Sequence, residues 1–143
     1  AEIGALDVDA MRAVFETNVF GLGDITNRVV PLLKAQALGD IVNIASTSGM
    51  KGAATATAYA GSKWAVRGIT QCWQAELRPF NLRVGCICPS EVQTGFGGRT
   101  GRNNPNKLYA ADIAATILAG LHLPQRVLWT ELAIFATNPW TED

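Results

Sequence analysis

The stretch GDIVNIASTSGMKGAATATAYAGSKWAV, residues 39–66, decides the fold because it changes from a strand pattern to a helix pattern. Gly39 and Asp40 open a β-branched run that predicts a buried strand ending in a loop rich in Ser, Thr and Gly. From residue 57 onward apolar residues recur every three or four positions, which predicts a helix that ends before Pro79. The stretch therefore reads as the strand, loop and helix of an α/β unit.

The rest of the chain repeats this alternation. Apolar residues spaced by three and four predict a long helix over 7–36, capped near Asp7 or Asp9. After residue 78 we expect a strand at 81–89, a polar loop at 90–106 that is a candidate lid, a helix at 108–121 and a strand at 131–136. Strands that alternate with helices favour parallel pairing and right-handed crossovers. The sequence thus predicts one domain, residues 1–143, with a three-layer, Rossmann-type α/β architecture.

Composition excludes several classes of partner. The chain has 143 residues, 48% of them hydrophobic, which suffices for one domain with a sizeable core. Lys and Arg number 12, as do Asp and Glu, and no basic run is interleaved with aromatic residues. We therefore expect no nucleic acid and no membrane as partners, and no apolar run approaches the length of a membrane span.

The cysteines and the histidine suggest neither a disulfide framework nor a metal centre. Cys86 and Cys88 share one face of a predicted strand, in a spacing that is not typical of zinc or thioredoxin-like sites. Together with Cys72 they favour buried, reduced thiols and a cytoplasmic protein. His122 is the only histidine, so we expect no metal site.

Three polar residues are placed where α/β sheets bind ligands. Tyr59 and Lys63 are one helical turn apart at the start of the predicted helix, and Ser46 follows the predicted strand. An ammonium group next to a phenol favours the phenolate, so Tyr59 becomes a usable proton donor and acceptor. A serine hydroxyl beside it can hold a substrate oxygen.

Four motifs together resemble the short-chain dehydrogenase/reductase family, from about Leu6 to near the C-terminus. They are NVFG (18–21), IVNIAS (41–46), YAGSK (59–63) and CPSEVQT (88–94), which are similar to the family's N-V-x-G helix, I-V-N-I-S-S strand, Y-x-x-x-K helix and P-G-x-x-x-T segment. The resemblance implies a catalytic set and a cofactor-binding set. The catalytic set is Asn18, Ser46, Tyr59 and Lys63, and the cofactor-binding set is Tyr59, Lys63, Pro89, Val92 and Thr94.

The resemblance also implies a reaction, hydride transfer between NAD or NADP and a carbonyl or secondary alcohol. Tyr59 would donate the proton, Ser46 would hold the oxygen, Lys63 would bind the nicotinamide ribose and Asn18 would anchor a water. PSEVQT (89–94) and AADIA (110–114) are similar to 3-oxoacyl-acyl-carrier-protein reductases, which implies a 3-oxoacyl thioester as substrate. The helices near 9–33 and 57–78 correspond to those that form homo-oligomers in this family.

One part of the family's pattern is missing from these residues. The sequence has no G-x-x-x-G-x-G turn for the pyrophosphate, and GFGGRTG (95–101) is its nearest substitute. We expect an incomplete sheet in which strand 41–45 has a free edge, with Ile41, Val42 and Ile44 partly uncovered. The chain is therefore expected to be the C-terminal catalytic portion of a longer enzyme and inactive alone. The choice between NAD and NADP stays open.

Two alternatives belong to other functional classes. A non-catalytic module could associate through the same helices and bind no cofactor. A hydrolase could use Ser46 as a nucleophile activated by Lys63, although no G-x-S-x-G elbow is present.

Overall fold

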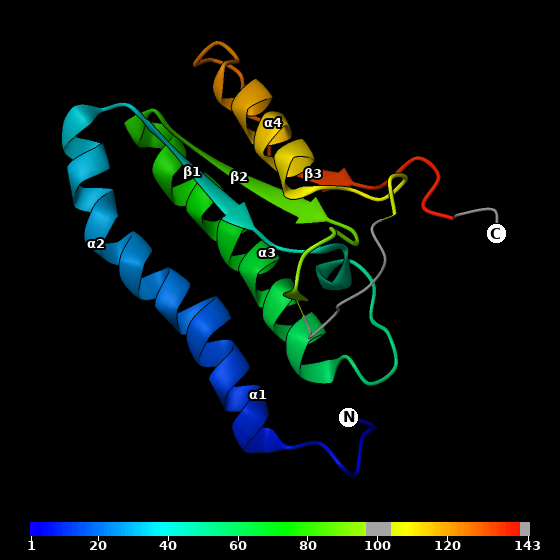
Figure 1. The fold of residues 1–143 in the computed structure, drawn as a ribbon. Coiled ribbons are helices and arrows are strands. Elements are labelled where there is room, and N and C mark those ends of the chain that lie inside the picture. The colour runs from blue at the N-terminus through cyan, green and yellow to red at the C-terminus, as the bar shows by residue number, and fades with distance from the viewer. Residues whose placement is uncertain (97–103, 141–143) are drawn as a thin grey trace.

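The computed structural model describes residues 1–96 and 104–140, and its helices and strands alternate as the sequence predicts (Figure 1). Most of the GFGGRTG stretch and the middle of the candidate lid, residues 97–103, lie outside the described residues. In chain order the elements are α1 (Val8–Phe15), a π-helical turn (Glu16–Phe20), α2 (Gly21–Gln36), β1 (Gly39–Ile44), a 3-10 turn (Thr47–Gly49), α3 (Thr57–Leu77), a 3-10 turn (Arg78–Phe80), β2 (Leu82–Pro89), α4 (Ala110–Leu121) and β3 (Glu131–Ile134).

The long N-terminal helix is one run interrupted by a π-helical turn. Asp7 caps its start, because its Oδ1 atom accepts a hydrogen bond of 2.9 Å from the amide of Ala10. The turn at Glu16–Phe20 contains Asn18 and separates α1 from α2, a break that apolar spacing alone does not predict. π-Helical turns occur often at functional sites, so the place of Asn18 in this turn is notable.

The strands form a parallel sheet in the order β1–β2–β3. Gly39 to Ile44 of β1 pair with Leu82 to Ile87 of β2, and Cys86 to Pro89 of β2 pair with Glu131 to Ile134 of β3. Every residue of β2 is buried, including Arg83, the one charged residue of this otherwise apolar strand. The predicted α/β fold with a parallel, incomplete sheet is confirmed.

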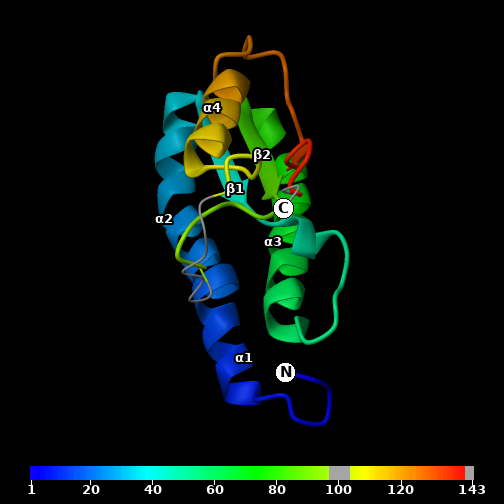
Figure 2. The ribbon, with the colours of Figure 1, turned by 45° about the vertical axis from the view of Figure 1, so that its right-hand side comes forward.

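Helices cover both faces of the sheet, as Figures 1 and 2 show for α3 and α4. On one face Cys86 and Cys88 of β2 pack with Val66 of α3. On the other face Gly85 leaves room for the indole of Trp129, which also fills the space beside Gly120 of α4. The sheet therefore forms the middle of three layers.

The two crossover connections have opposite hands. The strands are parallel and lie in chain order, while α3 and α4 lie on opposite faces of the sheet (Figures 1 and 2). The expectation that every crossover is right-handed is therefore wrong for one of them. The segment of about twenty residues between Pro89 and Ala110 is far longer than most connections, which allows the chain to reach the second face.

Among the described residues, β1 lies at one edge of the sheet. Within the described ranges β1 pairs only with β2, and the side chain of Ile44 is 45% exposed. Ile41 and Val42 are half-buried. The predicted free edge of this strand and its partly uncovered apolar residues are confirmed.

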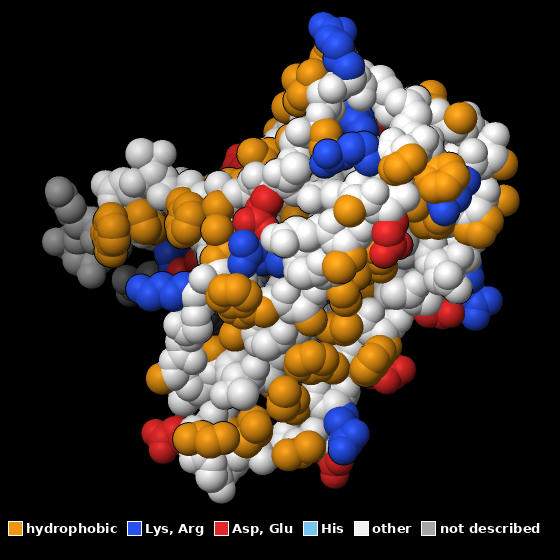
Figure 3. All heavy atoms as spheres, turned by 180° about the vertical axis from the view of Figure 1, so that it is seen from behind, with side chains coloured by type: hydrophobic (Ala, Val, Ile, Leu, Met, Phe, Trp, Pro, Cys, Tyr) orange, Lys and Arg blue, Asp and Glu red, His pale blue; other side chains and the backbone are white. Residues whose placement is uncertain are grey.

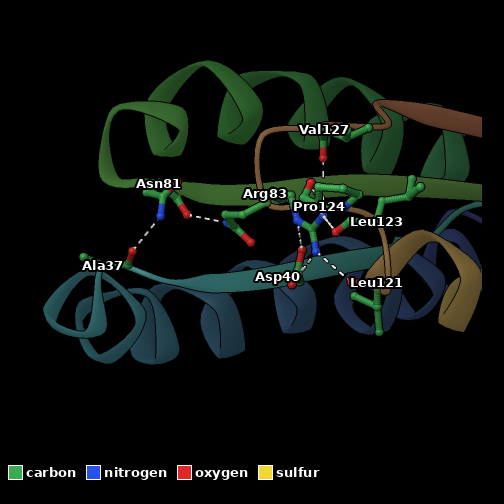
Figure 4. A network of polar contacts seen from close by, with 9 residues as sticks. Ala37, Asp40, Asn81, Arg83, Leu121, Leu123, Pro124 and Val127 are labelled. Atoms are coloured by element: carbon green, nitrogen blue, oxygen red, sulfur yellow. Dashed lines mark hydrogen bonds and ion pairs between the residues drawn. The ribbon is translucent and has the colours of Figure 1, made fainter.

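A buried arginine network joins the amino ends of the strands to the end of α4 (Figure 4). Arg83 of β2 donates to both carboxylate oxygens of Asp40 of β1, at 2.5 and 3.1 Å, and to the carbonyl oxygen of Leu121 at 3.0 Å. It also donates to the carbonyl of Leu123 at 2.9 Å. A guanidinium is suited to this position because it offers many donors, and α4 presents unpaired carbonyls at its C-terminus.

The thiols differ from the expectation at one position. Cys86 and Cys88 are buried and free, with their Sγ atoms 3.9 Å apart on the same strand face, but Cys72 is exposed. The expectation of a buried Cys72 is therefore wrong, because this residue lies on the outer side of an amphipathic helix. In the described part of the chain no helix has both the length and the apolar character to cross a lipid bilayer.

We expect Gly85→Ala to destabilise the protein, because the added Cβ would overlap the ring of Trp129. Overpacking of this kind costs about 1–3 kcal/mol of unfolding free energy, measurable by urea denaturation. Gly68→Ala on α3 is the control, since a Cβ there meets nothing within 4 Å. It should be neutral or stabilising by up to about 1 kcal/mol. Equal effects at both positions would contradict the packing described.

Candidate active site

An open cavity of about 440 Å³ lies at the carboxyl end of the sheet. This is the edge at which parallel α/β sheets bind ligands. It is lined by Ile44, Ala45, Ser46, Thr47, Ser48, Tyr59, Lys63, Pro89, Ser90, Glu91, Val92, Thr94 and Phe96. All the sequence-predicted site residues except Asn18 are therefore brought to one cavity.

Tyr59 lies in the first turn of α3, half-buried at the cavity wall. Its ring centroid is 5.5 Å from that of Phe96, and the two rings are tilted by 48°. The ammonium nitrogen of Lys63 is 5.8 Å from the centroid of the Tyr59 ring. The phenol and the ammonium thus share one face of α3, as their spacing predicts.

Lys63 reaches back to the end of β1. Its Nζ atom donates a hydrogen bond of 2.9 Å to the carbonyl oxygen of Ile44. Burial lowers the pKa of Lys63 from its ordinary value of 10.5, and the nearby Cys86 and Cys88 oppose this shift. The cation is therefore partly desolvated at the cavity floor.

Ser46 caps the short turn that follows β1. Its side-chain oxygen accepts a hydrogen bond of 3.1 Å from the amide of Ser48, and its backbone is extended. No hydrogen bond joins the described side chains of Ser46 and Lys63, and the lysine ammonium donates to the carbonyl oxygen of Ile44 instead. The arrangement therefore does not favour a hydrolase in which Lys63 activates Ser46.

Asn18 lies outside the cavity and supports the helix that carries Tyr59. Its Nδ2 atom donates a hydrogen bond of 3.1 Å to Oγ of Ser62, and this hydroxyl donates a hydrogen bond of 2.8 Å to the backbone carbonyl of Tyr59. Ser62 is fully buried. The π-helical turn is thus joined to the first turn of α3 through two hydrogen bonds.

The structure adds site residues that sequence reasoning missed. Phe96 and Glu91 line the cavity, and Glu91 forms an ion pair of 3.0 Å with Lys107. Gln93 joins the two ends of the candidate lid through two hydrogen bonds to Asn104. Its side-chain nitrogen donates to the carbonyl of Asn104 at 2.7 Å, and its side-chain oxygen accepts from the backbone amide of Asn104 at 2.6 Å. The polar composition of 90–106 indicated a functional loop, but no local pattern singled out these residues.

Cys86, Cys88 and Glu131 form a cluster outside this cavity, with ligand atoms within 4.8 Å of one another. Both oxygens of Glu131 accept hydrogen bonds from Arg67. Burial raises the pKa of both thiols, that of Cys88 to about 12. A metal ion here would meet protonated thiols and a neighbouring guanidinium, so we assign no metal to the cluster.

The short chain dehydrogenase family model matches residues 1–105. An uncharacterized oxidoreductase of Staphylococcus saprophyticus is 36% identical over 128 residues, which are 90% of this chain and 55% of that protein. The closed form of serine dehydrogenase complexed with NADP+ matches with a TM-score of 0.85 at 25% identity, covering 93% of this chain and 58% of that chain. A betaketoacyl-[ACP] reductase from Bacteroides thetaiotaomicron matches with a TM-score of 0.74 at 25% identity, covering 91% of this chain and 55% of that chain. This chain therefore spans little more than half the length of these relatives.

We expect the amine of Lys63 to titrate below 10.5, because burial disfavours its charged form. Nitrogen-15 NMR of lysine-labelled protein measures this midpoint, and Lys63→Met identifies the signal. The unfolded chain holds the proton up to a higher pH than the folded chain does. Stability relative to Lys63→Met should therefore rise with pH between the folded-state pKa and 10.5. A midpoint at or above 10.5 would contradict the burial described.

Proposed function

Since this chain belongs to the short-chain dehydrogenase family, we propose that it carries the catalytic residues of an NAD(P)-dependent oxidoreductase that interconverts carbonyls and secondary alcohols. The observation that carries the proposal is the convergence of Ser46, Tyr59 and Lys63 on one cavity at the carboxyl edge of the sheet. The same cavity is lined by Val92 and Thr94, the two residues assigned to the nicotinamide end of the cofactor.

The residues of the cavity fit the nicotinamide end of such a cofactor. Lys63 has N–H donors beyond the one that it gives to Ile44, which suits a ribose hydroxyl. Val92 and Thr94 offer a backbone segment and a hydroxyl at the rim, and Pro89 adds an apolar contact. When bound, NAD(P)H supplies the hydride. The residues described below handle the proton and the substrate oxygen.

Tyr59 is the proton donor in this mechanism. In the direction of reduction its phenol gives a proton to the substrate oxygen while Ser46 holds that oxygen by a hydrogen bond. The Lys63 ammonium then favours the phenolate that remains. We propose further that Asn18 anchors a water that links Lys63 to solvent, and its connection to the first turn of α3 through Ser62 supports this role.

A 3-oxoacyl thioester is the proposed substrate. The support is the likeness to a betaketoacyl-[ACP] reductase and an apolar wall of the cavity formed by Phe96, Val92 and Pro89. A panel of 3-oxoacyl thioesters, steroids and polyols tests this class. Activity confined to polyols would overturn it.

The glycine-rich turn expected for the pyrophosphate is the part of such a cofactor site that these 143 residues do not contain. The sequence has no G-x-x-x-G-x-G turn, and β1 pairs only with β2 in the part of the chain that the structure describes. We therefore propose that residues 1–143 are the catalytic portion of a complete enzyme in which a nucleotide-binding part adds the missing strands. A helix N-terminus with a glycine-rich turn is the usual source of pyrophosphate binding.

Association of copies through the N-terminal helices and α3 is also proposed. Seen from the side of α3, the surface carries many hydrophobic side chains over its lower half (Figure 3). Large apolar side chains of these helices are exposed, namely Phe20, Ile25, Leu32 and Trp64. Such a surface suits a homo-oligomer, and it would equally serve a non-catalytic interaction module.

We expect Tyr59→Phe to abolish turnover of the complete enzyme, because it removes the proton donor and keeps the packing of the ring. Thermal unfolding should show an unchanged fold. Tyr109→Phe, at the N-cap of α4 and outside the set of residues that line the cavity, is the control and should retain activity. Turnover by Tyr59→Phe comparable to that of the unaltered enzyme would overturn the proposed function and favour the interaction module.

Residues 1–143 alone should not bind NADH or NADPH at micromolar concentration, because the pyrophosphate lacks its backbone donors and helix dipole. Calorimetric titration with both cofactors, combined with light scattering, measures this. The free edge of β1 should make the isolated chain monodisperse only as an oligomer. Tight binding by a monomer would show that the cofactor site is complete in these residues.

A further inference from the structure

Three polar side chains of α3 are spaced by four residues: Tyr59, Lys63 and Arg67. Residues at this spacing lie on one face of a helix, on successive turns. Tyr59 and Lys63 line the cavity, but Arg67 lies beyond it and is covered, with 15% of its side chain exposed. A covered guanidinium requires partners for its charge and its donors.

Arg67 has two kinds of hydrogen-bond partner, and the central carbon of its guanidinium also lies 5.2 Å from the centroid of the Trp64 ring. Its Nε and Nη2 atoms donate to the two carboxylate oxygens of Glu131, at 2.7 and 2.8 Å, in a paired geometry that fixes the guanidinium plane. Its Nη1 atom donates to the backbone carbonyl of Gly49. Arg67 therefore connects the first residue of β3 to the turn that follows β1.

The turn at Thr47–Gly49 packs closely against α3. A Cβ atom on Gly49 would lie 2.7 Å from the backbone carbonyl oxygen of Lys63, so only glycine fits at this contact. The backbone amide of Gly49 donates a hydrogen bond of 2.9 Å to the carbonyl oxygen of Ser46. The position of Gly49 thus sets the position of Ser46.

Ser46 is held on both sides by the same face of α3. Lys63 bonds the carbonyl of Ile44, two residues before it, and Arg67 bonds the carbonyl of Gly49, three residues after it. Because Tyr59 belongs to the same helix face, these two contacts fix the serine hydroxyl relative to the phenol.

The electrostatic surroundings support this arrangement. The bond to Glu131 raises the pKa of Arg67, so the guanidinium keeps its charge. Burial keeps the neighbouring thiols Cys86 and Cys88 protonated, and Glu131 is the counterion that contacts Arg67. Without Glu131 the guanidinium would be a covered charge without a balancing carboxylate.

We propose that Arg67 is a positioning residue, anchored by Glu131, that sets the geometry between Ser46 and Tyr59 for proton transfer. The proposal rests on the proposed function, and it extends the site by one helical turn to the pattern Y-x-x-x-K-x-x-x-R with a carboxylate on β3. Arg67 touches neither substrate nor cofactor in this account. Its effect is transmitted through the turn at Thr47–Gly49.

The test compares Arg67→Met and Arg67→Lys with Asp40→Asn in the complete enzyme. The Asp40–Arg83 pair is a matched control, because its side chains are 26% and 8% exposed and it lies at the opposite end of the strands (Figure 4). Arg67→Met should lower kcat by about 10- to 100-fold through misplacement of Ser46. The KM for the cofactor should change by less than about threefold, because the cofactor contacts remain. The kcat of Arg67→Lys should lie between those of Arg67→Met and the unaltered enzyme.

Hydrogen exchange separates this proposal from the proposed function. The amides of Gly49 and Met50 should exchange at least about tenfold faster in Arg67→Met than in the unaltered protein and in Asp40→Asn, since the turn loses its attachment to α3. An unchanged kcat in Arg67→Met, an equal loss in Asp40→Asn or unchanged exchange at Gly49 would each overturn the proposal. If Tyr59→Phe retains turnover, the proposed function fails, and the exchange result alone decides whether Arg67 holds the turn.

Discussion

The close approach of the turn after β1 to α3 is the constraint on which the site depends. Gly49 has no room for a side chain against the backbone of Lys63, and the carbonyls of Ile44 and Gly49 accept hydrogen bonds from α3. Ser46 lies between these two contacts. A strand end and a helix start that are thirteen residues apart in sequence, Ser46 and Tyr59, are in this way held at one cavity.

The amino ends and the carboxyl ends of the strands have different roles. At the amino ends the buried Arg83 balances Asp40 and satisfies carbonyls at the end of α4, which is a structural role. At the carboxyl ends the charged and polar groups line an open cavity. The ion pairs Asp40–Arg83 and Arg67–Glu131 have similarly small exposed fractions. Substitutions in the two pairs therefore distinguish a loss of folding stability, expected for both, from a misplacement of Ser46 relative to Tyr59, expected only for Arg67–Glu131.

Much of this fold is readable from local patterns, and the rest depends on tertiary contacts. The strand and helix over 39–77 follow from β-branched and three-to-four periodicity, and Tyr59 and Lys63 follow from one helical turn. The π-helical turn at Asn18 and the opposite hands of the crossovers depend on packing between distant elements. Arg67 was missed although it continues the spacing of four, because its partners Gly49 and Glu131 are distant in sequence.

The central claim is that these residues serve hydride transfer to a carbonyl carbon, and isotope transfer tests it most directly. The complete enzyme is incubated with NADPH or NADH that carries two deuterium atoms at C4 of the nicotinamide, together with a 3-oxoacyl thioester. Mass spectrometry and NMR of the product should show a single deuterium on the new carbinol carbon. Formation of the alcohol without deuterium at that carbon, or consumption of the thioester by hydrolysis alone, would contradict the account.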